Sequence, residues 1–226
     1  MELKGKKVAF LGDSITEGVG VGDIANNRYD HILEQTCDLL KTYNYGIGGT
    51  RLAHQSKASD FPRWDLCFCG RAYNIEKNVD LVVVYGGVND YLHGDAPFGS
   101  IGDQTPHTFC GGVRFLMNLL KNDFVNRGIP VVFMTPARCH RSDFNYLEVS
   151  VHPNKKADAK PLLPYVEVIK ETGKLLDIPV LDLYHELLID PIDEQDRKKY
   201  TSDGLHFNDE GHKIIAARLK DFLQAL

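Results

Sequence analysis

The sequence predicts an α/β protein in which one five-stranded parallel sheet lies between two layers of helices, as a three-layer sandwich. Unbroken apolar runs such as 81–85 are typical of strands buried on both faces of a parallel sheet. Amphipathic segments with apolar residues at helical spacing alternate with these runs, which indicates consecutive β-α units. The 226 residues, 43% of them hydrophobic, suit a single domain over 1–226 with a substantial core.

Each element follows from local patterns of apolar residues, glycines and capping residues. The expected strands are 8–11, 42–45, 81–85, 129–134 and 178–183. The expected helices are 29–41 with Asn26 or Asn27 as cap, 71–77, 113–127 with Gly128 as a left-handed cap, 162–176, and a last helix after Asn208. The segments 52–70, 91–112, 136–160 and 193–199 are expected to be loops.

Composition and charge exclude several classes of protein. A net charge of -5 offers no basic surface for nucleic acid or anionic lipid. No apolar stretch approaches the roughly 20 residues that span a bilayer, and the polar segment 1–7 leaves no room for a signal peptide. We therefore expect a cytoplasmic protein without integral membrane association. The five cysteines lack the spacing of a disulfide framework and are expected to be reduced thiols.

The segment 8–18 places a serine where ligands bind in such folds. The apolar run 8–11 stops at Gly12 and Asp13, so Ser14 lies at the carboxyl end of a buried strand. In an open parallel sheet, this edge forms the ligand-binding crevice. Serine is also a residue that caps helices. Ser14 is therefore a candidate nucleophile, with helix capping as the alternative.

Near the end of the chain, Asp203 and His206 have the spacing of an orienting carboxylate and a general base. Residues three apart lie on the same side of a turn, where the carboxylate accepts a hydrogen bond from Nδ1–H. That bond leaves Nε2 free to accept a proton. The alternative is a turn-capping aspartate beside a polar surface histidine. Together with Ser14, the pair predicts a nucleophile, orienter and base in the chain order Ser, Asp, His.

Acyl transfer also needs hydrogen-bond donors for the developing oxyanion. Gly49 ends a glycine-rich turn after the second strand, and Asn89 follows the third strand. The backbone N–H groups of Gly49 and Ser14 and the side-chain amide of Asn89 are the predicted donors. Taken singly, Gly49 is as well explained as a turn glycine and Asn89 as a turn residue bonded to its own backbone. Their common position at strand ends favours one crevice.

Four short blocks resemble the signature blocks of the SGNH hydrolases, the GDSL esterase and lipase superfamily: GDSIT at 12–16, NYGIGG at 44–49, GVND at 87–90 and DGLH at 203–206. They occur in the family's order and extend from near the start of the chain to near its end. Each block alone is weakly specific, whereas the joint occurrence is highly specific. Ile15 stands where the family's name has leucine, which is a familiar variant.

The resemblance implies a flavodoxin-like sheet with strand order 2-1-3-4-5 and a serine esterase that forms an acyl-enzyme. It implies Ser14 as nucleophile and His206 with Asp203 as the base pair. The implied oxyanion donors are Ser14, Gly49 and Asn89. This chemistry requires neither a metal nor another cofactor, and no cluster with metal-ligand spacing is apparent.

Specificity is expected in the loops 50–65, 91–112 and 137–160. Residues in and near the first two loops are candidate substrate contacts, with solvated loop residues as the alternative: Asp13, Arg51, Trp64, Tyr91 and His93. Trp64 and Tyr91 would stack on sugar faces. The polar character of these loops argues against long acyl chains.

These features predict an esterase for small acyl groups, acetyl first, with a small-molecule ester as substrate. The resemblance to the SGNH hydrolases, many of which deacetylate carbohydrates, implies a carbohydrate as one candidate alcohol. A lysophospholipase or thioesterase is the alternative among enzymes. A catalytically silent glycan-binding protein is the alternative of another class, although such a protein has no need of an acid-base pair.

Overall fold

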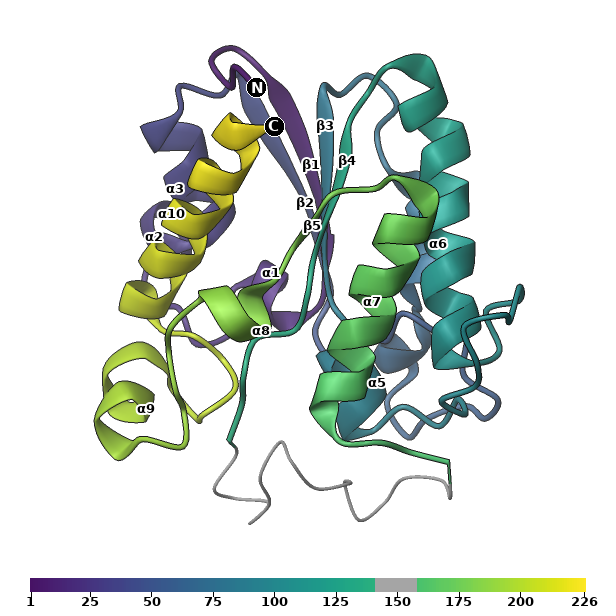
Figure 1. The fold of residues 1–226 in the computed structure, drawn as a ribbon. Coiled ribbons are helices and arrows are strands. Elements are labelled where there is room, and N and C mark those ends of the chain that lie inside the picture. Colours follow the sequence, from purple (N-terminus) through teal and green to yellow (C-terminus); the bar gives the residue numbers. More distant parts are fainter. Residues whose placement is uncertain (141–157) are drawn as a thin grey trace.

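The computed structural model describes residues 1–140 and 158–226, and its centre is one five-stranded sheet (Figure 1). All neighbouring strands pair in parallel, in the order β2-β1-β3-β4-β5. The predicted fold class and strand order are confirmed. The strands are β1 (Lys7–Gly12), β2 (Lys41–Gly46), β3 (Leu81–Tyr85), β4 (Val131–Met134) and β5 (Val180–Leu181).

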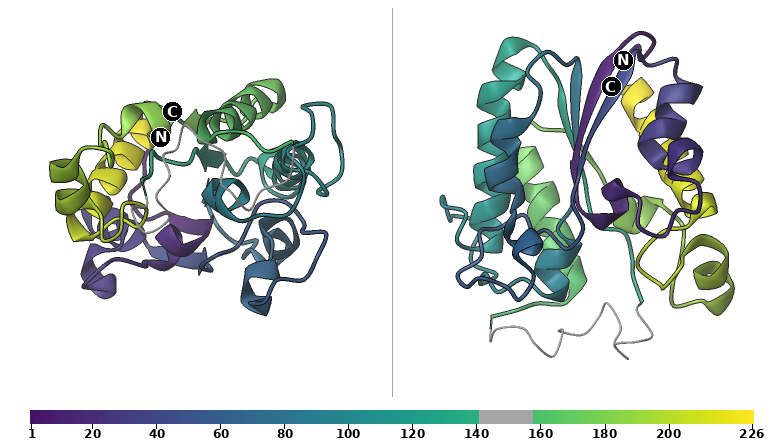
Figure 2. Two further views of the ribbon diagram at one scale, coloured as in Figure 1. Left: turned by 90° about the horizontal axis from the view of Figure 1, so that it is seen from below. Right: turned by 180° about the vertical axis from the view of Figure 1, so that it is seen from behind.

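Helices cover both faces of the sheet, α3 and α10 on one side and α6 and α7 on the other (Figures 1 and 2). The α-helices are α1 (Ser14–Glu17), α2 (Ile24–Asn27), α3 (Tyr29–Thr36), α4 (Phe68–Arg71), α5 (Val88–Leu92), α6 (Phe109–Asp123), α7 (Leu162–Leu176), α8 (Leu183–Glu186), α9 (Glu194–Tyr200) and α10 (Asp209–Ala225). Short 3₁₀ helices are η1 (Pro62–Asp65), η2 (Ala72–Asn74) and η3 (Val125–Arg127). Within the described residues, no helix combines the length and apolarity that crossing a membrane requires.

The apolar runs of the central strands supply two hydrophobic clusters, one on each face of the sheet. In β1, Ala9 and Leu11 face the cluster under α6 and α7, whereas Val8 and Phe10 face the cluster under α3 and α10. Successive side chains point to opposite faces of a strand, so an unbroken apolar run is needed to fill both layers. This packing explains why β1 and β3 have no polar side.

Several element boundaries differ from the sequence predictions. The predicted helix 29–41 begins as expected after Arg28 but ends at Thr36. It is shorter than predicted because β2 already starts at Lys41, and Leu40 before that strand is 65% exposed. The predicted loop 193–199 is helix α9, which Asp193 caps through bonds to two backbone N–H groups. Charged residues at both ends of α9 complement the helix dipole, so a mixed-charge segment forms a helix.

Three further boundaries shift. Helix α6 starts four residues before its predicted start at 113, and Gly128 has the expected left-handed conformation, with φ of +80°. The predicted helix 71–77 is replaced by α4 and η2, and β5 is shorter than the predicted strand 178–183.

The carboxyl ends of β1, β2 and β3 lie side by side and bring the first three sequence blocks together. Gly12 pairs in register with Gly46 of β2 and Tyr85 of β3. Helix α1 passes directly over the end of β2, where a Cβ on Gly46 would overlap the backbone of Thr16 and Glu17. Only glycine permits this close approach.

The buried guanidinium of Arg71 ties these strand ends to the following turn. It donates to the backbone oxygens of Tyr45 at 2.5 Å, Gly12 at 3.0 Å and Leu66 at 2.8 Å, and to Thr50 Oγ1 at 2.8 Å. Its plane also lies over the ring of Phe68, 4.8 Å from the centroid. One side chain therefore joins the ends of β1 and β2 to the loop beyond them.

Replacing Arg71 by methionine should lower the free energy of unfolding by about 2–4 kcal/mol, because several buried oxygens lose their donor. Urea denaturation followed by circular dichroism measures this loss. The matched control is Arg127→Met on the exposed side of η3, where a change below about 0.5 kcal/mol is expected. Equal effects of the two substitutions would contradict the role of Arg71.

Candidate active site

Ser14 opens the short helix α1 at the carboxyl end of β1. The helix is capped by Asp13, whose Oδ1 accepts from the backbone N–H of Ile15 at 3.0 Å, so Asp13 and not Ser14 is the capping residue. The side chain of Ser14 is therefore not used for capping. It is mostly buried, with 7% of the residue exposed, and its hydroxyl meets a histidine.

The hydroxyl of Ser14 lies 2.9 Å from Nε2 of His206, although the residues are 192 positions apart in the sequence. On the other side of the ring, His206 Nδ1 lies 2.8 Å from Oδ2 of Asp203. An ionised carboxylate only accepts, so Nδ1 carries the proton and Nε2 is the acceptor for the serine hydroxyl. The structure brings all three residues of the predicted set into one hydrogen-bonded chain.

The turn that holds Asp203 also keeps its carboxylate ionised. Oδ1 of Asp203 accepts from the backbone N–H groups of Leu205 at 3.0 Å and His206 at 2.8 Å. Burial raises the pKa of Asp203, but its bonds to the His206 ring and to these N–H groups outweigh burial and hold the pKa well below its ordinary value. Asp203 is therefore charged at neutral pH.

The turn after β2 carries Gly49 past the serine. A Cβ on the preceding Gly48 would lie 3.5 Å from the Cβ of Ser14, which places this turn beside the nucleophile. Gly49 has φ of +75°, and a Cβ there would overlap the indole of Trp64. Both the left-handed backbone and the close indole therefore require glycine at this position.

Asn89, in the first turn of α5, is bonded to the same turn. Its Nδ2 donates to the backbone oxygen of Thr50 at 3.0 Å, and its Oδ1 lies 3.2 Å from Nε2 of His93. The side chain is buried, at 4% exposure of the residue. Asn89 thus reaches across from the end of β3 to the residue that follows Gly49.

Three of the predicted substrate contacts, Arg51, Trp64 and His93, line a hollow of about 270 Å³. The Trp64 ring contacts the rings of Phe61 and His93, with centroids 4.5 Å and 4.6 Å apart and the ring planes tilted by 40° and 34°. Arg51 is almost fully buried and pairs with Asp65 at 2.9 Å, so its charge is already compensated. The hollow therefore has an aromatic wall beside the turn of Gly49.

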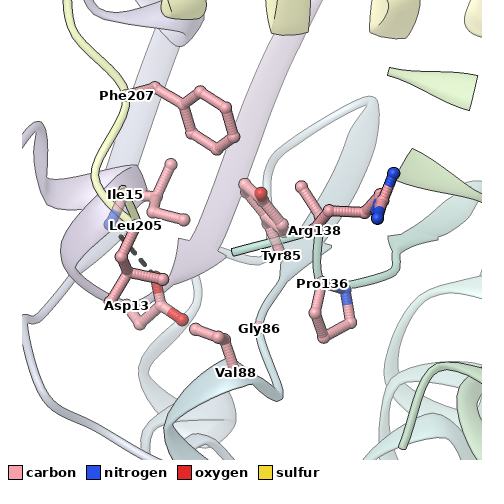
Figure 3. Close-up of a pocket in the computed structure, with 10 residues that line it drawn as sticks. Asp13, Ile15, Tyr85, Gly86, Val88, Pro136, Arg138, Leu205 and Phe207 are labelled. Atoms are coloured by element: carbon pink, nitrogen blue, oxygen red, sulfur yellow. Dashed lines mark hydrogen bonds between the residues drawn. The ribbon is translucent and has the colours of Figure 1, made fainter. Parts of the chain in front are cut away.

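The other two predicted contacts do not face this hollow. Tyr91 is fully buried and packs edge-on against Tyr165, so the prediction that it stacks on a sugar is wrong. Asp13 is also buried and lines a separate cavity of about 10 Å³, opposite Pro136 and Arg138 (Figure 3). Burial raises its pKa to about 6, although the Ile15 N–H opposes this shift. Most of the predicted specificity loop 137–160, namely residues 141–157, lies outside the residues that the structure describes.

Two side chains that no sequence motif singles out also shape the site. Oε2 of Glu17 accepts from the backbone N–H of Gly48 at 2.7 Å, and its Oε1 pairs with Arg63 of η1. Arg71 binds the strand ends, as described above. Glu17 and Arg71 both bind backbone atoms of segments that are distant in the sequence, so no spacing between residues could have indicated their roles. Among residues 1–140 and 158–226, no group of three potential metal ligands is found.

Comparisons with known proteins agree with this fold. The chain is 26% identical to a protein from Lactobacillus plantarum, with a TM-score of 0.83 over 99% of this chain and 98% of that one. It also has the fold of an acetyl xylan esterase, AlAXEase, at 22% identity and a TM-score of 0.60, covering 95% of this chain and 98% of that one. A carbohydrate acetylesterase family member from Sinorhizobium meliloti has 18% identity and a TM-score of 0.64, covering 97% and 98%.

None of the curated proteins compared with the chain matches it significantly. A family model, that of the GDSL-like lipases and acylhydrolases, matches residues 10–214. This range contains all four sequence blocks and both ends of the hydrogen-bonded chain from Ser14 to Asp203. The protein belongs to the GDSL-like lipase/acylhydrolase family.

Proposed function

We propose that the protein is a serine esterase that removes small acyl groups, acetyl first, from a carbohydrate ester through an acyl-enzyme intermediate. The observation that carries the proposal is the chain of hydrogen bonds from Ser14 Oγ to His206 and on to Asp203. Such a chain supplies a nucleophile, a base and an orienting carboxylate.

In the first step, Ser14 Oγ attacks the ester carbonyl carbon while His206 Nε2 takes the hydroxyl proton. The carbonyl oxygen becomes an oxyanion, which the N–H groups of Ser14 and Gly49 and the Asn89 amide stabilise. The carbon–oxygen bond to the alcohol then breaks, and His206 returns the proton to the leaving alcohol. Ser14 remains acylated.

In the second step, His206 takes a proton from water, whose oxygen attacks the acyl carbon. Collapse of the second tetrahedral intermediate releases the carboxylic acid and restores the Ser14 hydroxyl with the proton from His206. Throughout both steps the charge of Asp203 stabilises the imidazolium, and its low pKa keeps it ionised.

The polar surroundings of the site favour a small acyl group. The hollow beside Gly49 is lined largely by polar and charged side chains such as Lys57, Asp60 and Asp95, a surface that does not suit a long alkyl chain. The cavity that Asp13 and Phe207 line has a volume of about 10 Å³, the size of a single water site, and is no alkyl channel.

The hollow beside Gly49 favours a sugar as the alcohol. Its wall is the Phe61 and Trp64 pair, and its rim includes charged groups such as Lys57 and Asp60. Aromatic faces next to polar groups suit the mixed apolar and hydroxyl surface of a sugar ring. The acetyl xylan esterase and the carbohydrate acetylesterase family member that share the fold support the same substrate class.

Substitution of Ser14 by alanine should lower kcat/KM for p-nitrophenyl acetate at least about 10⁴-fold, because the acyl-enzyme can no longer form. Ser100→Ala, at an exposed serine between α5 and α6, is the matched control and should stay within about twofold. Near wild-type turnover in Ser14→Ala would contradict the proposed mechanism. A folded wild type that neither hydrolyses any ester nor reacts with a fluorophosphonate would indicate a binding protein.

Turnover should fall steadily along the p-nitrophenyl esters from acetyl to octanoyl, since the hollow beside Gly49 is lined largely by polar and charged side chains. Steady-state kcat/KM for the series at one pH measures the trend. A rise towards octanoyl would favour a lysophospholipase or thioesterase and would contradict the small-acyl assignment.

Removal of the exposed ring in Phe61→Ala should raise KM for an acetylated sugar about fivefold while kcat changes little, because ring stacking acts in binding. Kinetics of acetate release from acetylated xylose measures both parameters. The matched control is Tyr73→Ala, since Tyr73 and Phe61 are equally exposed, at 57%, and Tyr73 does not line the hollow. An unchanged KM in Phe61→Ala would place the sugar elsewhere.

A further inference from the structure

We propose that His93 is a positioning residue: it holds the side-chain amide of Asn89 with its NH₂ group towards the oxyanion and its oxygen away. This inference rests on the proposed esterase function and concerns the same site. The observation behind it is a chain of side-chain bonds that runs from Asp65 through Arg51 and His93 to Asn89.

Each contact in the chain has hydrogen-bond length. Arg51 NH2 donates to Asp65 Oδ1 at 2.9 Å, and Arg51 NH1 lies 3.1 Å from His93 Nδ1. His93 Nε2 in turn lies 3.2 Å from Asn89 Oδ1. Asn89 lies in the first turn of α5 and His93 is the residue that caps its end, so the two are four residues apart and their side chains lie on one side of the helix.

The chemistry of arginine sets the direction of every bond in this chain. A guanidinium has donors only, so His93 Nδ1 must accept from Arg51. The neutral ring therefore carries its proton on Nε2, and the Asn89 atom that faces Nε2 must be the amide oxygen. An amide turned the other way round would set two donors against each other, so the bonding pattern fixes the orientation of the Asn89 amide.

The opposite end of the amide agrees with this assignment. Asn89 Nδ2 donates one N–H to the backbone oxygen of Thr50, which could not bond an amide oxygen. The second N–H of Nδ2 has no acceptor among the described residues, so it remains for the oxyanion. Asn89 is thereby held from two sides, by Thr50 O on the turn of Gly49 and by His93 at the end of α5.

Neighbouring side chains hold this series of hydrogen-bonded residues in place. The ring of Trp64 packs over His93, with centroids 4.6 Å apart, and Arg51 is 3% exposed. Although burial opposes its ionisation, bonds from Ser59 and the charge of Arg51 lower the pKa of Asp65, so the carboxylate that orients Arg51 is charged at neutral pH. A buried, charge-anchored chain positions Asn89 before any substrate arrives.

The test is a double-mutant cycle on kcat for p-nitrophenyl acetate. Asn89→Ala alone should lower kcat about 10²- to 10³-fold. His93→Ala alone should lower it about tenfold, the worth of one lost hydrogen bond. In the Asn89→Ala background, His93→Ala should cost less than about twofold, because His93 acts only through the amide. A loss of equal size in both backgrounds would overturn the proposal.

Two further variants separate positioning from packing. His93→Gln carries a donor and an acceptor about as far apart as the ring nitrogens, so its kcat should stay within about threefold of wild type. His107→Ala, at an exposed histidine between α5 and α6, should leave kcat unchanged. Loss of kcat in His93→Gln equal to that in His93→Ala would show that ring packing matters and not the bond to Asn89.

The protonation of the His93 ring can also be measured directly on the wild-type protein, without an activity assay. The ¹⁵N chemical shifts of the His93 ring at neutral pH should show a proton on Nε2 and none on Nδ1. A proton on Nδ1 would overturn the proposed chain even if the esterase function holds. Conversely, activity retained in Ser14→Ala would refute the proposed esterase mechanism without changing the measured tautomer of His93. Failure of the proposed function and failure of the proposed role of His93 can therefore be told apart.

Discussion

The buried guanidinium of Arg71 is the constraint on which the geometry of the site depends. Parallel strands end with backbone oxygens that have no further strand partner, and here two such ends meet under the serine turn. Arg71 binds the oxygens of Gly12 and Tyr45 and the hydroxyl of Thr50, so β1, β2 and the turn of Gly49 share one hydrogen-bonding centre. Burial lowers its pKa to about 10, with Asp13 opposing the shift, so it stays charged at neutral pH.

Two aspartates near the serine show how the surroundings select the carboxylate that would orient the proposed base. Asp13 adjoins Ser14 in sequence, but it is enclosed, and burial raises its pKa to about 6. Asp203 comes from a distant loop, and its bonds to the His206 ring and two backbone N–H groups keep its pKa low despite burial. The imidazolium of the proposed mechanism is better stabilised by Asp203, which stays ionised at lower pH than Asp13.

The sequence predicted the sheet and the proposed catalytic residues because both depend on local patterns. Apolar runs identify buried strands, and the polar groups that follow them must meet at one edge of a parallel sheet. Arg71 and Glu17 escaped prediction because they bind backbone atoms of segments far away in the chain. Tyr91 was misjudged for a related reason: it follows the GVND block and suggested a loop, but α5 turns its ring into the core against Tyr165.

The proposed site joins two units that are positioned in different ways. Ser14 and the turn of Gly49 are held by the sheet and by Arg71, whereas His206 is held by its own turn, closed by a bridge between Thr201 and Phe207. The bond from Ser14 Oγ to His206 Nε2 links them across the crevice. Because each unit is ordered by contacts outside this bond, the serine and the base meet at hydrogen-bond distance before a substrate binds, which is the preorganisation that acyl transfer requires.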